Sequence, residues 1–139
     1  MVSIKSIQLD SINNAKRIVL KVGSALIVNP KTGNINESWV KSLVQDILFL
    51  LKNNKEILIV SSGAIALGKS ELNLQNKSLK LSEKQAAAAT GQILLAKAWK
   101  SIFEKVNIKC GQILVGHSDL ETRRNAMNTR ATLNTLLKL

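Results

Sequence analysis

The sequence predicts an α/β protein built on a mainly parallel sheet with helices on its faces. Three aliphatic, largely β-branched runs, residues 18–22, 56–60 and 111–115, indicate buried strands. The segments between and after them carry apolar residues at helical spacing. The resulting order is strand, helix, strand, helix, helix, strand, helix, which is typical of parallel strands joined by right-handed helical crossovers.

The first half of the chain begins with a weakly patterned stretch, residues 1–16, which we expect to be a mobile N-terminal extension. After the first strand, residues 29–34 have the composition of a turn, and a short hairpin is expected with Ile35 on its returning arm. Asn36 is placed to cap a helix whose apolar stripe runs from Val40 to about Leu51.

The second half begins with the strand at 56–60 and continues directly into a short helix ending near Leu72. The pair Ser82 and Gln85 matches a capping box and predicts the start of the longest helix. Four consecutive alanines and Gly91 in that helix predict close packing against another element. Asp119 is placed to cap the last helix, and no linker is evident between the halves.

The composition is that of an ordinary soluble domain. The chain has 139 residues, of which 45% are hydrophobic and 21% charged. Its single cysteine, Cys110, excludes an internal disulfide or a cysteine metal cluster, which fits a reducing compartment. The N-terminus lacks the apolar core of a signal peptide, and the longest aliphatic-aromatic run, residues 47–51, is far shorter than a membrane span of about 18 residues. We therefore expect a cytoplasmic protein that does not use a membrane.

The net charge of +11 raises the alternative of a basic nucleic-acid-binding module. The lysines and arginines are scattered rather than clustered, and aromatic residues make up only 3% of the chain, leaving little to stack on bases. We therefore expect no nucleic-acid partner, and steeply salt-dependent binding of DNA or RNA would contradict that expectation.

Lys21 is the first candidate functional residue, because it lies near the end of an apolar strand. A lysine there is costly unless its ammonium meets an anion, and in parallel sheets ligands bind at the carboxyl ends of the strands. Gly23 allows close approach of the backbone, and Ser24 adds a hydroxyl and a backbone donor. These features predict a phosphate site, the alternative being a lysine that extends into solvent.

A second junction of the same kind follows the 56–60 strand, where Ser62, Gly63 and Ala64 lead directly into a helix. A hydroxyl beside a helix N-terminus suits a carboxylate or a phosphate. The alternative is structural: Ser61 or Ser62 caps the helix, and Gly63 eases the turn.

Other kinds of site are not indicated. The glycines fit neither a P-loop nor a dinucleotide-binding fingerprint. His117 has no partners in the sequence for a nucleophile triad or a zinc site, so we expect a loop histidine and no protein-bound metal.

Four segments together resemble a known family. They are Lys21-Val-Gly-Ser, Val60-Ser-Ser-Gly-Ala-Ile-Ala, Gln85-Ala-Ala-Ala-Ala-Thr-Gly-Gln and residues 119–137. Their order and spacing resemble the N-terminal part of the glutamate 5-kinases, within the amino acid kinase family. The resemblance covers residues 17–139 and implies a three-layer α/β/α sandwich, of which these residues would be a partial domain, the amino-acid-binding lobe.

The resemblance also implies a reaction, in which ATP with Mg²⁺ phosphorylates the side-chain carboxylate of L-glutamate to glutamyl 5-phosphate, the first step of proline biosynthesis. Lys21 matches the catalytic lysine that touches the transferred phosphoryl group, and Gly23 and Ser24 match the loop near the phosphates. Ser62, Gly63 and Ala64 match the substrate-binding segment. Phosphoryl transfer depends on positioning and charge neutralisation, which a lysine and oriented amides supply.

The same resemblance predicts truncation at mid-domain, because the family's later glutamate-binding and nucleotide-binding segments have no counterpart here. Gly116, Asn125 and Ala126 also differ from the residues usual in the family. Two alternatives to an active kinase therefore stay open: an inactive relic, and half of a split enzyme that needs self-association or a complementing C-terminal half.

Overall fold

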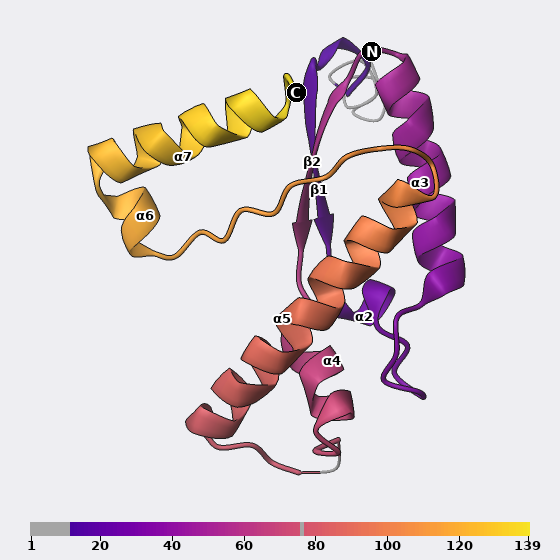
Figure 1. Ribbon diagram of the computed structural model, residues 1–139, viewed down its shortest axis with the longest axis vertical. Coiled ribbons are helices and arrows are strands. Elements are labelled where there is room, and N and C mark those ends of the chain that lie inside the picture. Colours follow the sequence, from indigo (N-terminus) through magenta and orange to yellow (C-terminus); the bar gives the residue numbers. More distant parts are fainter. Residues whose placement is uncertain (1–11, 76) are drawn as a thin grey trace, which may run out of the picture. The chain divides into compact units, whose positions relative to one another are not determined.

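The computed structural model describes residues 12–75 and 77–139 (Figure 1). The chain forms two compact units, one ending at Ile108 and the other running from Lys109 to Leu139. The sequence showed no sign of this boundary. Most of the expected N-terminal extension, residues 1–11, lies outside the described residues. The elements are β1 (Arg17–Val22), α2 (Ser24–Ile27), α3 (Glu37–Lys52), β2 (Glu56–Ser61), α4 (Ala64–Glu71), α5 (Leu81–Glu104), α6 (Ser118–Glu121) and α7 (Arg123–Leu136).

Within the described residues of the first unit, β1 and β2 form a sheet, and they run parallel as predicted (Figure 1). Their register pairs Arg17 with Glu56 at one end and Val22 with Ser61 at the other. The connection between them contains α3, so the two strands and this helix form a βαβ unit. The α/β class and the parallel sheet are therefore confirmed.

The two faces of this sheet have different surroundings. Leu20, Val22 and Ile59 belong to the hydrophobic clusters that also contain residues of α3 and α5. Val19 and Val60 project from the other face and are 58% and 55% exposed. The described residues of this unit thus supply a helical layer on one face, whereas an α/β/α sandwich has a layer on both.

The stripe predicted for α3 is confirmed. Asn36 occupies the N-cap position, and Val40, Val44 and Ile47 are almost completely buried. Phe103 of α5 joins Val44 and Ile47 in one cluster. These apolar contacts fix α3 against α5 and against the inward face of the sheet.

The hairpin between α2 and α3 is also confirmed, because Val28 forms an isolated antiparallel bridge with Ile35. The amide of Asn29 donates to the carbonyl of Asn34 at 2.7 Å, and Gly33 adopts a φ of +70°. A positive φ of this size favours glycine, which explains the residue at this turn.

Helices α4 and α5 pack at unusually short range. A Cβ built on Gly68 would overlap the carbonyl of Ala87, and one built on Gly91 would overlap the carbonyl of Ala64. The close packing predicted for this segment is confirmed. The predicted capping box is wrong, however: α5 begins at Leu81, and the Glu83 carboxylate accepts a hydrogen bond from the Lys80 amide at 2.8 Å. Glu83, three residues after Lys80, thus caps α5 at a start that lies before Ser82.

The third predicted strand, residues 111–115, is wrong, because the structure has irregular backbone there. A strand requires a neighbouring strand for its hydrogen bonds, and the unit from Lys109 to Leu139 contains only α6 and α7. Leu114 is 72% exposed. Within this unit, a Cβ on Gly111 would lie 3.1 Å from a methyl of Leu136.

The cap predicted for the last helix is wrong as well. Thr122 is the N-cap of α7, and its hydroxyl accepts a hydrogen bond from the Asn125 amide at 3.3 Å. Asp119 lies in the short α6 instead, where its carboxylate accepts from the Gly116 amide at 2.7 Å. Two consecutive helices replace the single one expected.

Candidate functional site

The two strand-to-turn junctions lie side by side at the carboxyl end of the sheet. Lys21 is paired in register with Val60, so both strands end at the same edge. A Cβ built on Gly63 would lie 3.0 Å from a methyl of Ile27 and 3.8 Å from the Cα of Ser24. The structure therefore brings the turn after β1 against the turn after β2, as the sequence predicted for a parallel sheet.

Ser62 links the two junctions through hydrogen bonds. Its amide donates to the carbonyl of Val22 at 3.0 Å, and its hydroxyl donates to the same carbonyl at 3.2 Å. The N-cap of α4 is Gly63, and the described residues provide no side-chain hydrogen bond that caps this helix. The structural alternative, a serine that caps α4, is therefore wrong, and among the described residues no side chain accepts from the first amides of the helix.

Gly63 is the residue that makes this turn possible. Its φ is +121°, a conformation that residues with a side chain rarely adopt, and it is buried. The chain passes from the last residue of β2 to the first residue of α4, Ala64, within three positions. This abrupt turn directs the N-terminus of α4, with its partial positive charge, to the edge where β1 and β2 end.

Lys21 belongs to the exposed face of β1, the face that also carries Val19. Among the described residues, no carboxylate lies within 4.0 Å of its ammonium. The cost of burying a strand lysine therefore does not arise here. Its charge is instead free to meet an anion at the sheet edge.

Gly23 and Ser24 form the turn on the β1 side. Gly23 is the N-cap of α2, with φ of −74° and ψ of 155°, and a Cβ at this position would meet nothing within 4 Å. The backbone conformation of Gly23 thus does not require glycine, but the space that a side chain would occupy there is open. Ser24 is exposed, so a ligand can approach the backbone of this turn from solvent.

Trp99 is a supporting residue that the sequence did not reveal. Its indole Nε1 donates to the hydroxyl of Ser61 at 3.1 Å, and its ring stacks on Phe103 with centroids 5.9 Å apart. The Ser61 hydroxyl donates in turn to the carbonyl of Ser62 at 3.3 Å. In the sequence Trp99 was one more apolar residue of a helical stripe, and nothing in that pattern marked its hydrogen bond to β2.

The clearest electrostatic feature lies at the opposite end of the sheet. Arg17 Nε and Nη2 donate to Glu56 Oε2 at 2.8 and 2.7 Å, and Lys16 lies 3.3 Å from the other oxygen. The Arg17 hydrogen bond, with Lys16, holds the pKa of the Glu56 carboxyl below its usual value. This cluster joins Arg17 and Glu56, the first residue pair of the two strands, whereas Lys21 lies near the other end of β1.

The described residues contain no group of three His, Cys, Asp or Glu side chains able to hold a metal ion. No helix in residues 12–75 and 77–139 is long and apolar enough to cross a membrane.

Comparison with known proteins identifies the family. Residues 16–139 match the sequence model of the amino acid kinase family. The chain is 53% identical over 131 residues to the proteins named glutamate 5-kinase from Brucella ovis, Brucella canis and Brucella suis. Each alignment covers 94% of this chain and 34% of the relative, so the chain spans about a third of the length of these relatives.

Proposed function

Since this chain belongs to the amino acid kinase family, we propose that it forms the amino-acid-binding part of a glutamate 5-kinase. The reaction is phosphoryl transfer from ATP to the side-chain carboxylate of L-glutamate, which gives glutamyl 5-phosphate for proline biosynthesis. The observation that carries the proposal is the juxtaposition of the Lys21 turn with the Ser62–Ala64 turn at one sheet edge.

Lys21 is proposed to neutralise the transferred phosphoryl group. Its ammonium has no protein anion within 4.0 Å among the described residues, so its charge is available to a ligand. Negative charge on the phosphoryl oxygens would meet a cation already placed at the end of β1, which is the kind of stabilisation on which phosphoryl transfer depends.

Ser62, Gly63 and Ala64 are proposed to hold L-glutamate. The uncapped N-terminus of α4 favours a carboxylate through its free amides and the helix dipole. The Ser62 hydroxyl now donates to Val22, whose carbonyl also accepts from the Ser62 amide. The hydroxyl can therefore turn to a substrate without leaving that carbonyl unsatisfied.

Gly23 and Ser24 are proposed to border the ATP phosphates, because the space above Gly23 is open. Bound ATP would supply the phosphoryl group, and Mg²⁺ arriving with it would neutralise part of the charge on its phosphates.

The exposed sheet face, with Val19 and Val60, is proposed to contact further protein. Either a second copy of the chain or the C-terminal part of a kinase domain would bury these side chains. We place this assembly in the cytoplasm, where an exposed free thiol such as that of Cys110 stays reduced.

The test is glutamate-dependent release of ADP from Mg-ATP. The 139-residue chain is assayed alone and mixed with the C-terminal two thirds of the Brucella ovis relative. Turnover that Lys21→Ala abolishes and that Lys31→Ala, a change of an exposed hairpin lysine, leaves intact would support the proposal. Equal rates for both variants would contradict the role of Lys21. A folded chain inactive under both conditions would favour the relic.

A further inference from the structure

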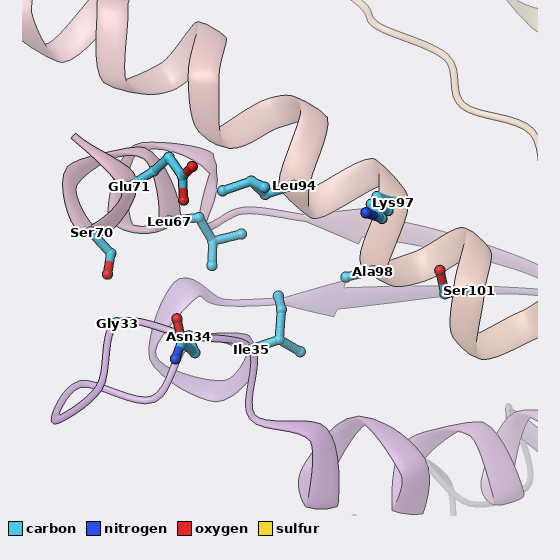
Figure 2. Close-up of a pocket in the computed structure, with 10 residues that line it drawn as sticks. All are labelled: Gly33, Asn34, Ile35, Leu67, Ser70, Glu71, Leu94, Lys97, Ala98 and Ser101. Atoms are coloured by element: carbon cyan, nitrogen blue, oxygen red, sulfur yellow. The ribbon is translucent and has the colours of Figure 1, made fainter.

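The indole of Trp99 reaches from α5 to Ser61, the last residue of β2. Its ring packs against both hydrophobic clusters of the first unit and stacks on Phe103. Other side chains of α5, among them Ala98 and Ser101, line a cavity of about 350 Å³ beside the 28–35 hairpin (Figure 2), and Trp99 does not line that cavity. The face of α5 that carries Trp99 is thus directed to the sheet, where packing holds the ring in place.

The hydrogen bond between Trp99 and Ser61 can run in only one direction. An indole nitrogen donates its proton and does not accept one, so the Ser61 oxygen is the acceptor at 3.1 Å. The hydroxyl proton of Ser61 is thereby left for the carbonyl of Ser62, 3.3 Å away. Without the indole, the same hydroxyl is free to rotate away from that carbonyl.

The carbonyl of Ser62 belongs to the same planar peptide group as the amide of Gly63. In a trans peptide the C=O and the N–H point in opposite directions, so a bond that holds one also fixes the direction of the other. A carbonyl that accepts a hydrogen bond also polarises its peptide group and makes the N–H a stronger donor. The residues that the structure describes offer no acceptor to the Gly63 N–H, which belongs to the N-cap of α4. The chain of hydrogen bonds from Trp99 therefore ends on a donor that a ligand can use.

We propose that Trp99 is a positioning residue of the glutamate site, an inference that rests on the function proposed above. Through the Ser61 hydroxyl it holds the peptide group between Ser62 and Gly63, so that the Gly63 N–H is aligned for a substrate carboxylate before the substrate arrives. The single donor of the indole is occupied by Ser61, so Trp99 acts on the substrate through the turn and not by direct contact. A donor fixed in advance binds a carboxylate without the cost of ordering a mobile one.

The first experiment follows the Gly63 amide by NMR in the folded 139-residue chain labelled with ¹⁵N. Trp99→Phe should move the ¹⁵N resonance of Gly63 upfield, because the Ser62 carbonyl loses a hydrogen bond that withdraws electrons from the peptide nitrogen. Ser61→Ala removes the same hydroxyl but keeps the indole, and it should move this resonance in the same direction. Trp39→Phe, the same substitution on α3, should leave it in place. A Gly63 resonance that does not move in either Trp99→Phe or Ser61→Ala would overturn the proposal, whether or not glutamate binds.

The second experiment titrates these chains with L-glutamate, alone and mixed with the C-terminal part of the relative, and follows the amides of residues 62–64. Trp99→Phe and Ser61→Ala should each weaken glutamate about fivefold, and the double variant should bind no more weakly, because both changes break one chain of hydrogen bonds. Ser61→Thr, which keeps a hydroxyl, should recover most of the affinity that Ser61→Ala loses. Trp39→Phe measures the effect of general destabilisation and should bind glutamate as the unmodified chain does.

The two proposals fail in different ways in this titration. Equal affinities of the unmodified chain and Trp99→Phe for glutamate would overturn the positioning role and leave the proposed function intact. An equal loss in Trp39→Phe would also overturn it, since the effect would then not depend on the Ser61 hydrogen bond. If the unmodified chain shows no response to glutamate at residues 62–64 under either condition, the proposed glutamate site itself is contradicted, and the role of Trp99 in that site with it.

Discussion

The Cα of Gly91 faces the carbonyl oxygen of Ala64 at a distance that leaves no room for a side chain. Ala64 is the first residue of α4, and Gly91 is a buried residue of α5. The position of the proposed glutamate-binding turn is therefore determined partly by a glycine that is 27 residues away and carries no functional group.

Replacing this glycine tests that dependence. Gly91→Ala should destabilise the chain by about 3 kcal/mol, because the new methyl group must push α4 away from α5. Urea denaturation followed by circular dichroism measures the change. Gly23→Ala is the control: its φ of −74° suits alanine and its Cβ meets nothing within 4 Å, so stability should change by less than about 1 kcal/mol. Equal losses for both variants would show that the α4–α5 contact is not the cause.

Ser62→Ala separates binding from stability. The Val22 carbonyl keeps its bond from the amide of residue 62, so removing the hydroxyl should cost no more than about 1 kcal/mol. The assay uses the chain alone or its mixture with the C-terminal part of the relative, whichever shows turnover. If the hydroxyl binds glutamate, the KM for glutamate should rise about tenfold, with little change in the KM for ATP. A rise in the KM for ATP alone would instead place Ser62 on the nucleotide side.

Trp99→Phe probes the hydrogen bond between α5 and β2. Phenylalanine preserves much of the stacking on Phe103 but leaves the Ser61 hydroxyl without its donor, so the free energy of unfolding should fall by about 1–2 kcal/mol. Trp39→Phe is a control at a half-buried tryptophan for which the described residues provide no hydrogen bond. A larger loss at Trp39 would show that ring size, and not the hydrogen bond, decides the effect.

The Glu56 cluster should make stability depend on acid pH. The pKa of Glu56 is lowered in the folded state, chiefly by the Arg17 hydrogen bond, so the unfolded chain binds a proton first as the pH falls. The stabilisation is therefore complete above the ordinary glutamate pKa of about 4.3 and is lost as the pH drops through the lower folded value. Glu56→Gln should be less stable than the unmodified chain at pH 7, and the difference should shrink by pH 3.

A matched substitution tests whether any exposed carboxylate would behave in the same way. Glu37→Gln removes an exposed partner of Lys41 at 3.5 Å and should change stability little at either pH. Urea denaturation at pH 7 and pH 3 compares the three chains. If Glu56→Gln lowers the free energy of unfolding by the same amount at pH 7 and at pH 3, titration of the Glu56 carboxyl is not the source of the effect.

The exposed sheet face should govern self-association. The double variant Val19→Thr with Val60→Thr keeps β-branched residues in the strands but makes the face more polar. Light scattering coupled to size exclusion should then show a smaller apparent mass than for the unmodified chain. Ile93→Gln, a change at a 71% exposed residue of α5, should leave the mass unchanged. A reduced mass for Ile93→Gln alone would move the interface to the helix.

Local pattern was sufficient to predict much of the first unit. The β-branched runs of β1 and β2, the stripe of α3 and the turn residues of the hairpin act within a few positions of one another, and all appear where the sequence indicates them. The shared edge of the two junctions also followed, because parallel strands carry their carboxyl ends on the same side.

Tertiary structure decided the rest, since those outcomes depend on partners distant in the chain. Residues 111–115 have the composition of a strand, but their own unit offers no strand to pair with. The Ser62 hydroxyl, a plausible helix cap by position, donates instead to Val22, 40 residues earlier. The sequence by itself thus determined the α/β class and the candidate residues, whereas hydrogen-bond partners and close helix packing determined how those residues are held.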